Sequence, residues 1–174
     1  MAEVPDTESV RRPKPQPPKA GQESVWDYPR PPALVASDEL VRVWLDDVLI
    51  VETRAAKRIL ETSHAPAYYL PRNDVRMDLI AVNPHRSWCE FKGQAHYGDV
   101  DNGTQQVRDV CWWYPDPSPG YEPLAGMISF YPQRVTRCEV DGETVTPLPS
   151  NFYGDWPTSK IAGPYKGALG TEGW

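Results

Sequence analysis

Several features that define common protein classes are missing from this chain. Its three cysteines, Cys89, Cys111 and Cys138, form no Cys-x-x-Cys pair, so neither a disulfide framework nor a zinc ribbon is indicated. No apolar run approaches the length needed to span a bilayer, and the first residues lack the apolar segment of a secretory signal. We therefore expect a protein of a reducing compartment, the cytoplasm, with no membrane partner.

A basic surplus is also lacking. The formal net charge is -6, and residues 25–174 carry 14 basic against 20 acidic side chains. Nucleic acid polymers are bound largely through neutralisation of their phosphates, which requires a basic face. The acidic balance argues against such a polymer, but it still allows a small nucleotide in a local pocket. The chain also has no glycine-rich phosphate loop.

Two residue classes are unusually abundant. Proline occurs 20 times, and seven tryptophans and nine tyrosines stand against three phenylalanines. Tyrosine and tryptophan combine an apolar body with a polar tip, so they favour pocket walls and interfaces. A fold broken by many prolines could equally use large rings to pack its few elements, and both interpretations stay open. The length of 174 residues suits a single domain.

The composition divides the chain into four parts. Residues 1–24 are proline-rich and poor in apolar residues, which predicts a disordered leader that adds nothing to stability. Residues 25–39 predict an extended strap whose aromatic rings dock on the domain. Residues 40–146 hold the regular structure, and residues 147–174 predict an irregular, aromatic-rich strap.

Short strands separated by turn signals predict a mainly β fold. Leu40–Leu45 and Val48–Thr53 form a β-branched hairpin pattern around two aspartates, and Arg54–Glu61 predicts one short helix. Hairpin turns are expected at Asp101–Thr104 and at Asp141-Gly142. Further strands are expected at Ala67–Leu70, Arg76–Val82, Gln94–Val100, Gln105–Tyr114, Met127–Tyr131 and Val135–Val140. The spacing favours antiparallel sheets with long irregular termini.

A set of short motifs is spread over about residues 40–140. They are Arg54–Glu61, Tyr68–Pro71, Asp74–Arg76, Cys89–Gly93, Tyr97 and Trp113–Pro117. Together they resemble the bacterial family called domain of unknown function 427, which is sometimes labelled nucleotidyltransferase-like. The resemblance implies a β-tent, two antiparallel sheets around a groove. Some other β-tent proteins hold zinc through paired cysteines, which this chain lacks, so no metal is carried over, and the family supplies no established activity.

The pair Lys92-Gly93 is the first candidate for chemistry. A glycine allows a tight turn, and the lysine before it can hold an anionic ligand, although a solvated turn lysine is the structural alternative. On the following strand His96 and Tyr97 point to opposite faces, and the family match favours Tyr97 as the site residue. Trp112 and Trp113 must likewise point to opposite faces, one to the core and one to the groove.

Other polar groups are weaker candidates. Arg76 follows Arg72 and Asp74 in an alternating run that could grip an anion or form an ion pair within a turn. Asp99 and Asp101 share a strand face but run into a hairpin turn, and the three histidines are dispersed, so we expect no metal and no cofactor. The residues expected to bind a ligand are Lys92, Tyr97, Trp113, Arg76, Glu61 and Tyr69.

Three functions fit these features. The leading hypothesis is a small-molecule-binding domain, in which an aromatic groove and a lysine and an arginine hold an anionic ligand. The second is a nucleotidyltransferase-like enzyme acting on a nucleotide or related substrate, with Lys92, Tyr97 and Glu61 as anchoring or acid/base groups. The third is a structural or partner-binding protein whose aromatic residues form a homodimer.

Overall fold

Antiparallel β-strands make up most of the regular structure in a computed structural model that describes residues 12–174. The strands are β1 (Glu23–Ser24), β2 (Ala33–Ala36), β3 (Val41–Leu45), β4 (Val48–Thr53), β5 (Lys57–Leu60), β6 (Ala67–Pro71), β7 (Ile80–Cys89), β8 (Gly93–Asp101), β9 (Gln106–Trp113), β10 (Met127–Phe130), β11 (Arg137–Val140), β12 (Glu143–Thr144) and β13 (Ile161–Ala162). Helical structure within residues 12–174 is limited to the three-residue turns η1 (Val25–Asp27), η2 (Arg72–Asp74), η3 (Met77–Leu79), η4 (Glu122–Leu124) and η5 (Pro132–Arg134). The mainly β prediction is confirmed.

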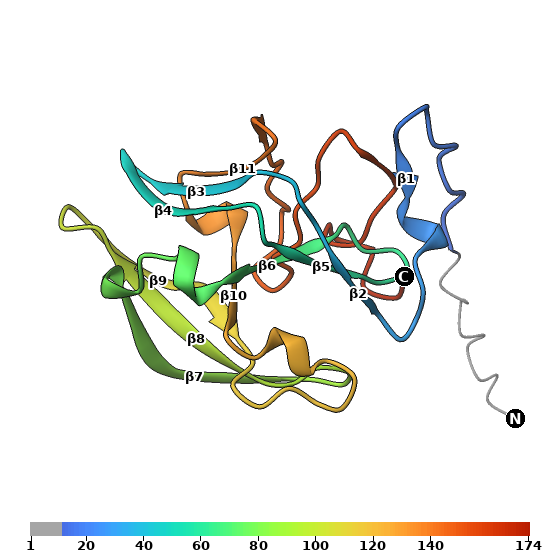
Figure 1. The fold of residues 1–174 in the computed structure, drawn as a ribbon. Helices are drawn as coiled ribbons and strands as arrows, with labels where there is room; N and C mark the ends of the chain where they lie inside the picture. The colour runs from blue at the N-terminus through green and yellow to red at the C-terminus, as the bar shows by residue number, and fades with distance from the viewer. Residues whose placement is uncertain (1–11) are drawn as a thin grey trace, which may run out of the picture.

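The strands form two antiparallel sheets and one short parallel pair. The large sheet has seven strands in the order β2-β5-β6-β10-β9-β8-β7, and the small sheet has four in the order β12-β11-β3-β4. Strand β1 pairs with β13 in parallel. Figure 1 shows β3, β4 and β11 as a layer on one side of the large sheet, with β7 and β8 at the far edge.

The central strands β6 and β10 of the large sheet are buried on both faces, and strand alternation decides what each face carries. On β6, Tyr68 and Leu70 pack with the small sheet, while Tyr69 between them belongs to a second cluster on the opposite face. On β9, Cys111 lies in the first cluster and Trp112 in the second. One face therefore packs an aliphatic core, and the other carries a layer rich in tyrosine and tryptophan.

The predicted hairpins are confirmed. Strands β3 and β4 pair around Asp46, whose φ of 53° gives the left-handed turn, and β8 pairs with β9 around Asn102 and Gly103. Asp141 and Gly142 have φ values of 49° and 80° and join β11 to β12. These are the positions at which aspartate, asparagine and glycine tolerate positive φ.

The short helix expected at Arg54–Glu61 is wrong, because its second half is strand β5. Lys57–Leu60 pairs with β2 on one side and with β6 on the other. Two backbone ladders are worth more than the modest helix propensity of one turn, so tertiary pairing overrides the local preference. Before β5, the Thr53 hydroxyl accepts a hydrogen bond from Ala55 N at 3.0 Å, which fixes a turn in place of a helix cap.

The strand expected at Arg76–Val82 starts later and runs much further. Its first residues belong to the helical turn η3, and β7 continues through Pro84 to Cys89. Strand β7 is the edge of the sheet, and its pairing with β8 shifts register between Val82 and Arg86. Proline is tolerated at such an edge because no ladder hydrogen bond is lost there.

The predicted terminal segments pack against the sheets. Residues 1–11 of the expected leader lie outside the described part of the chain, whereas Gln16 N donates to Gly163 O at 2.8 Å, and Glu23 and Ser24 form β1. The expected strap at residues 25–39 contributes β2 to the large sheet. Trp156 of the C-terminal segment is fully buried, stacks on Tyr68 and donates through Nε1 to Phe130 O at 2.9 Å.

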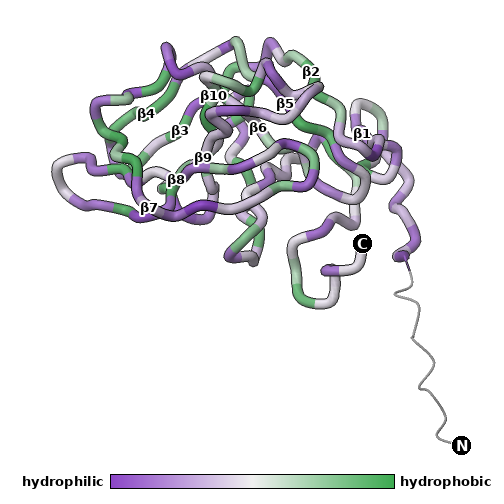
Figure 2. The backbone as a smooth tube through the Cα atoms, turned by 90° about the horizontal axis from the view of Figure 1, so that it is seen from below, coloured by the Kyte–Doolittle hydropathy of each residue, from purple (hydrophilic) through white to green (hydrophobic). Residues whose placement is uncertain are grey.

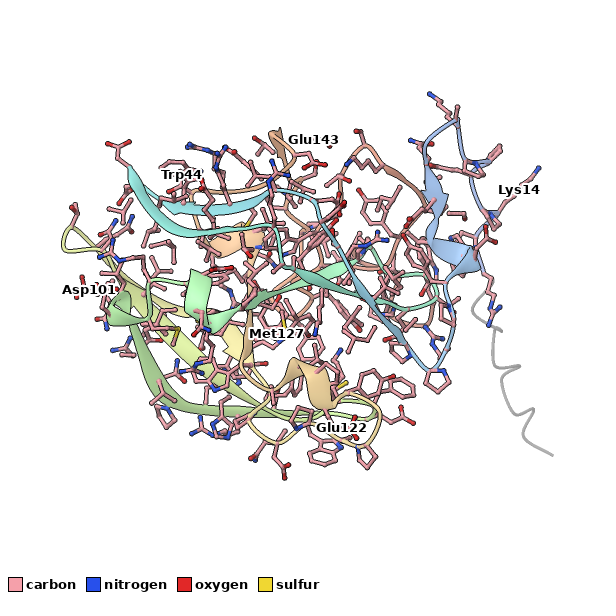
Figure 3. The ribbon with its side chains drawn as sticks, in the orientation of Figure 1. Lys14, Trp44, Asp101, Glu122, Met127 and Glu143 are labelled. Carbon is pink, nitrogen blue, oxygen red and sulfur yellow. The ribbon has the colours of Figure 1, made fainter. Side chains whose placement is uncertain are left out.

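The distribution of polar residues follows these layers. Figure 2 shows hydrophobic stretches along strands such as β4, while the projecting loops are mainly hydrophilic or neutral. In Figure 3 Met127 lies in the interior, whereas Asp101, Glu122 and Glu143 lie at the periphery.

None of the helical segments in residues 12–174 has both the length and the apolar character to cross a membrane.

Candidate binding site

A cavity of about 460 Å³ lies against the aromatic face of the large sheet. Several regions of the chain line it: the strap at Arg30, the segment from β5 to β6, the end of β7 with the turn after it, strands β8 and β9, the residue after β10, and the C-terminal segment. The lining residues that the site depends on are Arg30, Glu61, His64, Tyr69, Lys92, Tyr97, Trp112, Tyr114, Tyr131, Gly154, Asp155 and Lys166. This volume falls in the range of known small-molecule sites, about 300–1,000 Å³.

The turn between β7 and β8 presents Lys92 to the cavity. Gly93 has a φ of 105°, which favours glycine, and an added Cβ there would lie 3.2 Å from Ser118 Oγ. Ser118 N donates to Lys92 O at 3.0 Å, which ties the turn to the loop after β9. The Lys92 ammonium lies 5.7 Å from the centre of the Tyr114 ring, within the range of a cation–π contact.

Lys92 keeps its charge although it is partly buried. Burial by itself lowers the pKa of the lysine, but Tyr69, Cys89 and the carboxyl groups of Asp155 and Glu61 act in the opposite direction and outweigh it. The net pKa is raised above the ordinary value, so the side chain is an ammonium ion at neutral pH. In the part of the chain that the structure describes, no carboxylate forms a salt bridge with it.

Aromatic side chains form the walls around this ammonium group. Trp112 Nε1 donates to the Tyr69 hydroxyl at 3.2 Å, and the Trp112 and Tyr131 rings have centroids 4.5 Å apart. The Tyr97 hydroxyl lies 2.8 Å from Ser87 Oγ. Burial raises the pKa of Tyr69 and of Tyr114, so both phenols are neutral at physiological pH. The walls are therefore apolar surfaces with a few fixed hydroxyl groups.

Two carboxyl groups face the cavity in different environments. Glu61 Oε2 lies 3.3 Å from the Arg30 guanidinium, its ionic partner, and 3.5 Å from His64 Nδ1. Burial raises the pKa of Asp155 to about 6, against the opposing effect of His64 and Lys92. Asp155 Oδ2 is closed off from solvent and has no hydrogen-bond partner in the described residues.

Four of the six residues predicted as site residues meet at this cavity, and two do not. Glu61, Tyr69, Lys92 and Tyr97 line it together. Trp113 packs against the core on the other face of the sheet, with the Arg72 guanidinium 5.9 Å from its ring.

The other predicted residue that misses the cavity is Arg76. Its guanidinium forms an exposed ion pair with Asp78 at 2.8 Å. An ion pair within a turn is one of the two roles that the sequence allows for the arginine run, and this pair satisfies Arg76 away from the cavity.

Trp112 lines the cavity in place of Trp113, and strand pairing explains why. Trp112 lies directly opposite Tyr97 in the β8–β9 ladder, and directly paired residues point to the same face. Once Tyr97 is assigned to the groove, the register therefore selects Trp112. His96 pairs with Trp113 and lies on the other face with it.

Glu90, in the turn before Lys92, was not identified as a cavity residue in the sequence. Neither were three further charged residues: Arg30, Asp155 and Lys166. They lie in the segments flanking residues 40–146, where no periodic pattern indicates a shared face. Among these flanking residues, Gly154 gave the one local indication of the site. It lies beside Asp155 in an aromatic segment, and a glycine allows the backbone to approach another part of the chain closely.

No group of three or more histidine, cysteine, aspartate or glutamate side chains within residues 12–174 has a metal-binding arrangement. The three cysteine thiols are unpaired, with Cys111 and Cys138 buried.

A family model described as "Domain of unknown function (DUF427)" and labelled NTP_transf_9 matches residues 33–141, which is more than half of the chain. No curated protein was found to match. The matched span contains Lys92, Tyr97 and Glu61, whereas Asp155 and Lys166 lie beyond its end.

Proposed function

The chain belongs to the DUF427 family, and from that premise we propose that its aromatic-walled cavity binds a small planar molecule with an anionic group, held by Lys92. The family description states no activity. The proposal therefore rests on the chemistry of the cavity.

The observation that carries the proposal is the partly buried Lys92 ammonium, which lines the cavity without a salt-bridge partner in the described residues. A charge taken out of water is costly unless an opposite charge or several hydrogen bonds compensate it. Here the ring of Tyr114 gives only a cation–π contact, at 5.7 Å. An anionic group on a ligand would supply the missing counter-charge.

The walls support a planar ligand. Tyr69, Trp112 and Tyr114 are each less than a tenth exposed and present ring faces and edges. A flat ring can stack on such surfaces with little loss of conformational entropy. The Tyr97 hydroxyl and the Arg30 guanidinium add polar groups that can orient the ligand.

Replacing Lys92 by methionine tests this function, with benzoate as the probe. Methionine keeps most of the lysine stem and removes the charge, so we expect benzoate to bind the Lys92→Met variant at least about tenfold more weakly than the unaltered chain. The melting temperature without benzoate should change little. Isothermal titration calorimetry measures the affinity, and differential scanning calorimetry measures the melting temperature.

Lys14→Met is the matched control, because Lys14 is exposed, lies outside the cavity lining and is seen at the periphery of the molecule in Figure 3. This variant should bind benzoate like the unaltered chain. A Lys92→Met variant with unchanged affinity and a much lower melting temperature would show that Lys92 serves the fold.

An enzyme is the second candidate, and one observation favours it. Lys92, Glu61, His64 and Asp155 line the same cavity, so groups able to donate and accept protons surround one volume. A nucleotidyltransferase-like reaction is the form that the family label suggests. Incubation with nucleoside triphosphates and Mg²⁺, followed by ³¹P NMR, distinguishes the two: turnover lost in Lys92→Met supports an enzyme, and binding without turnover supports a binding domain.

The remaining parts of the proposal concern architecture and setting. The two sheets are consistent with a β-tent, whose groove would correspond to the cavity. Three unpaired thiols suit the reducing cytoplasm.

A homodimer is the third alternative. It is supported by Trp88 on β7, whose side chain is 72% exposed, and analytical ultracentrifugation tests it.

A further inference from the structure

Asp155 is held firmly in the cavity wall by both of its neighbours. Trp156 is fully buried, and its backbone N donates to Pro66 O at 2.8 Å. Gly154 sits so close to the ring of Trp112 that an added Cβ would lie 2.5 Å from Cη2. The backbone on each side of Asp155 is therefore fixed against the large sheet, and the carboxyl group has little freedom to turn away from the cavity.

The Asp155 carboxyl group lacks the partners that a buried acid normally has. Within residues 12–174 neither a backbone N–H nor a side-chain donor forms a hydrogen bond with Oδ2, and this oxygen is closed to solvent. Buried polar groups in proteins are nearly always hydrogen-bonded, and leaving one unpaired is costly. Asp155 as a whole is only partly buried and lines the cavity, so its carboxyl group can accept a hydrogen bond from a donor that arrives with a ligand.

The charges around the cavity define what kind of donor fits. Glu61 is already engaged by Arg30 and His64. Lys92 and Asp155 influence each other's pKa, but the structure shows no salt bridge between them within residues 12–174. A purely anionic ligand would compensate Lys92 and place a second negative charge near Asp155. A ligand with an acidic group and an amine would compensate both.

We propose that the ligand is amphoteric: a small aromatic acid that also carries an amine, with its acidic group at Lys92 and its N–H donor at Asp155. This inference rests on the proposed function, since it adds a second anchor to the same cavity. It also assigns a specificity role to the C-terminal segment, because Asp155 lies beyond the family-matched residues 33–141.

The test compares probes that share one ring. Benzoate has only the acidic group, benzylamine has only the amine, and 3- and 4-(aminomethyl)benzoate have both at two separations. At pH 7.5 we expect at least one aminomethyl isomer to bind the full chain about tenfold or more tightly than benzoate, because a hydrogen bond between charged groups is of that strength. Titration calorimetry or NMR chemical-shift titration gives the affinities.

The Asp155→Asn variant should lose this advantage, so that the aminomethyl isomers bind it no more tightly than benzoate does. Asparagine has nearly the same size and removes a buried charge, so the variant is expected to fold. The unaltered chain alone gives a second test. At pH 5, where protonated Asp155 predominates, the affinity advantage of the aminomethyl isomers over benzoate should shrink. Lys92, Glu61, His64 and Lys166 also influence Asp155, and a pH dependence that persists in Asp155→Asn would be assigned to them and would overturn the role of Asp155.

The outcomes separate the two proposals. If benzoate and both aminomethyl isomers bind the unaltered chain equally, the role of Asp155 is wrong, while the Lys92 site stands. If the advantage survives in Asp155→Asn, the role of Asp155 is wrong as well. If none of the probes binds, the proposed function itself is overturned.

Discussion

Burial affects Lys92 and Asp155 differently, because their surroundings differ. Acidic groups around Lys92 outweigh burial and raise its pKa. Around Asp155, burial outweighs the positive side chains and raises the pKa to about 6 from 3.8. The ionised Asp155 therefore opposes folding, which is typical of a functional group held in place by the rest of the structure.

This cost predicts a pH dependence of stability. Between about pH 4 and pH 6 the folded chain binds more protons at Asp155 than the unfolded chain does, so this group's contribution to the free energy of unfolding falls as the pH rises. At pH 7 the contribution has fallen by up to about 3 kcal/mol, since one pKa unit corresponds to about 1.4 kcal/mol. We expect Asp155→Asn to raise the free energy of unfolding at pH 7 by about 1–3 kcal/mol and to change it little at pH 4.

Urea unfolding of both proteins at pH 4 and pH 7 measures this difference. Asp116→Asn is the control, because Asp116 is exposed on the loop after β9, and it should leave the pH dependence unchanged. A lower stability of Asp155→Asn at pH 7 would mean that the carboxylate stabilises the folded chain, which is the opposite of the expected effect.

At the scale of elements, the contact between the C-terminal segment and β9 sets the position of Asp155. An added Cβ at Gly154 would lie 2.5 Å from Trp112 Cη2 and 2.9 Å from Tyr131 Cδ1, and both rings are buried. Because buried rings cannot yield easily, a side chain at residue 154 must push the segment away from the sheet.

Gly154→Ala should therefore reduce stability and binding together. We expect a loss of about 1–3 kcal/mol in the free energy of unfolding, the usual cost of overpacking. The advantage of the aminomethyl probes over benzoate should also fall, because Asp155 moves with the segment. Gly103→Ala serves as the control: its added Cβ meets nothing within 4 Å, and only the positive φ of 90° is strained. That variant should lose some stability and keep its probe affinities, and a Gly154→Ala variant with the same result would show that close packing at Gly154 does not position Asp155.

The elements that the sequence predicted correctly are those with local signals. The hairpin of β3 and β4 and the turn at Asp141-Gly142 combine alternating apolar residues with residues that favour positive φ. Strand β5 was predicted as part of a helix because its local pattern lacks a period of two, and only pairing with β2 and β6 makes it a strand. The end of β7 was missed because Asn83, Pro84, His85 and Arg86 interrupt its apolar pattern, which an edge strand tolerates.

The same distinction applies to the site. Lys92 and Tyr97 were identified from a tight turn followed by a strand, together with the family resemblance. Arg30 and Asp155 reach the cavity through contacts between segments that are distant in the sequence, such as Arg30 with Glu61 and Trp156 with Pro66, for which no local pattern exists. Trp113 was chosen over Trp112 because alternation predicts opposite faces without stating which face is which.

At the scale of the whole molecule, the cavity is a product of the complete fold. The strap provides Arg30, the family-matched region provides Lys92 and the aromatic walls, and the C-terminal segment provides Asp155 and Lys166. Strand pairing between β1 and β13 connects the two ends of the described chain. The site therefore depends on segments that lie on both sides of the family-matched residues 33–141.

The most direct test of the central claim is a crystal structure of the full chain grown with benzoate. We expect electron density for benzoate in the cavity against the large sheet, with its ring beside Tyr69 and Trp112 and a carboxylate oxygen within about 4 Å of Lys92 Nζ, the limit for an ion pair. Benzoate bound elsewhere, or a cavity holding only ordered water at a benzoate concentration that saturates the protein in solution, would contradict the claim.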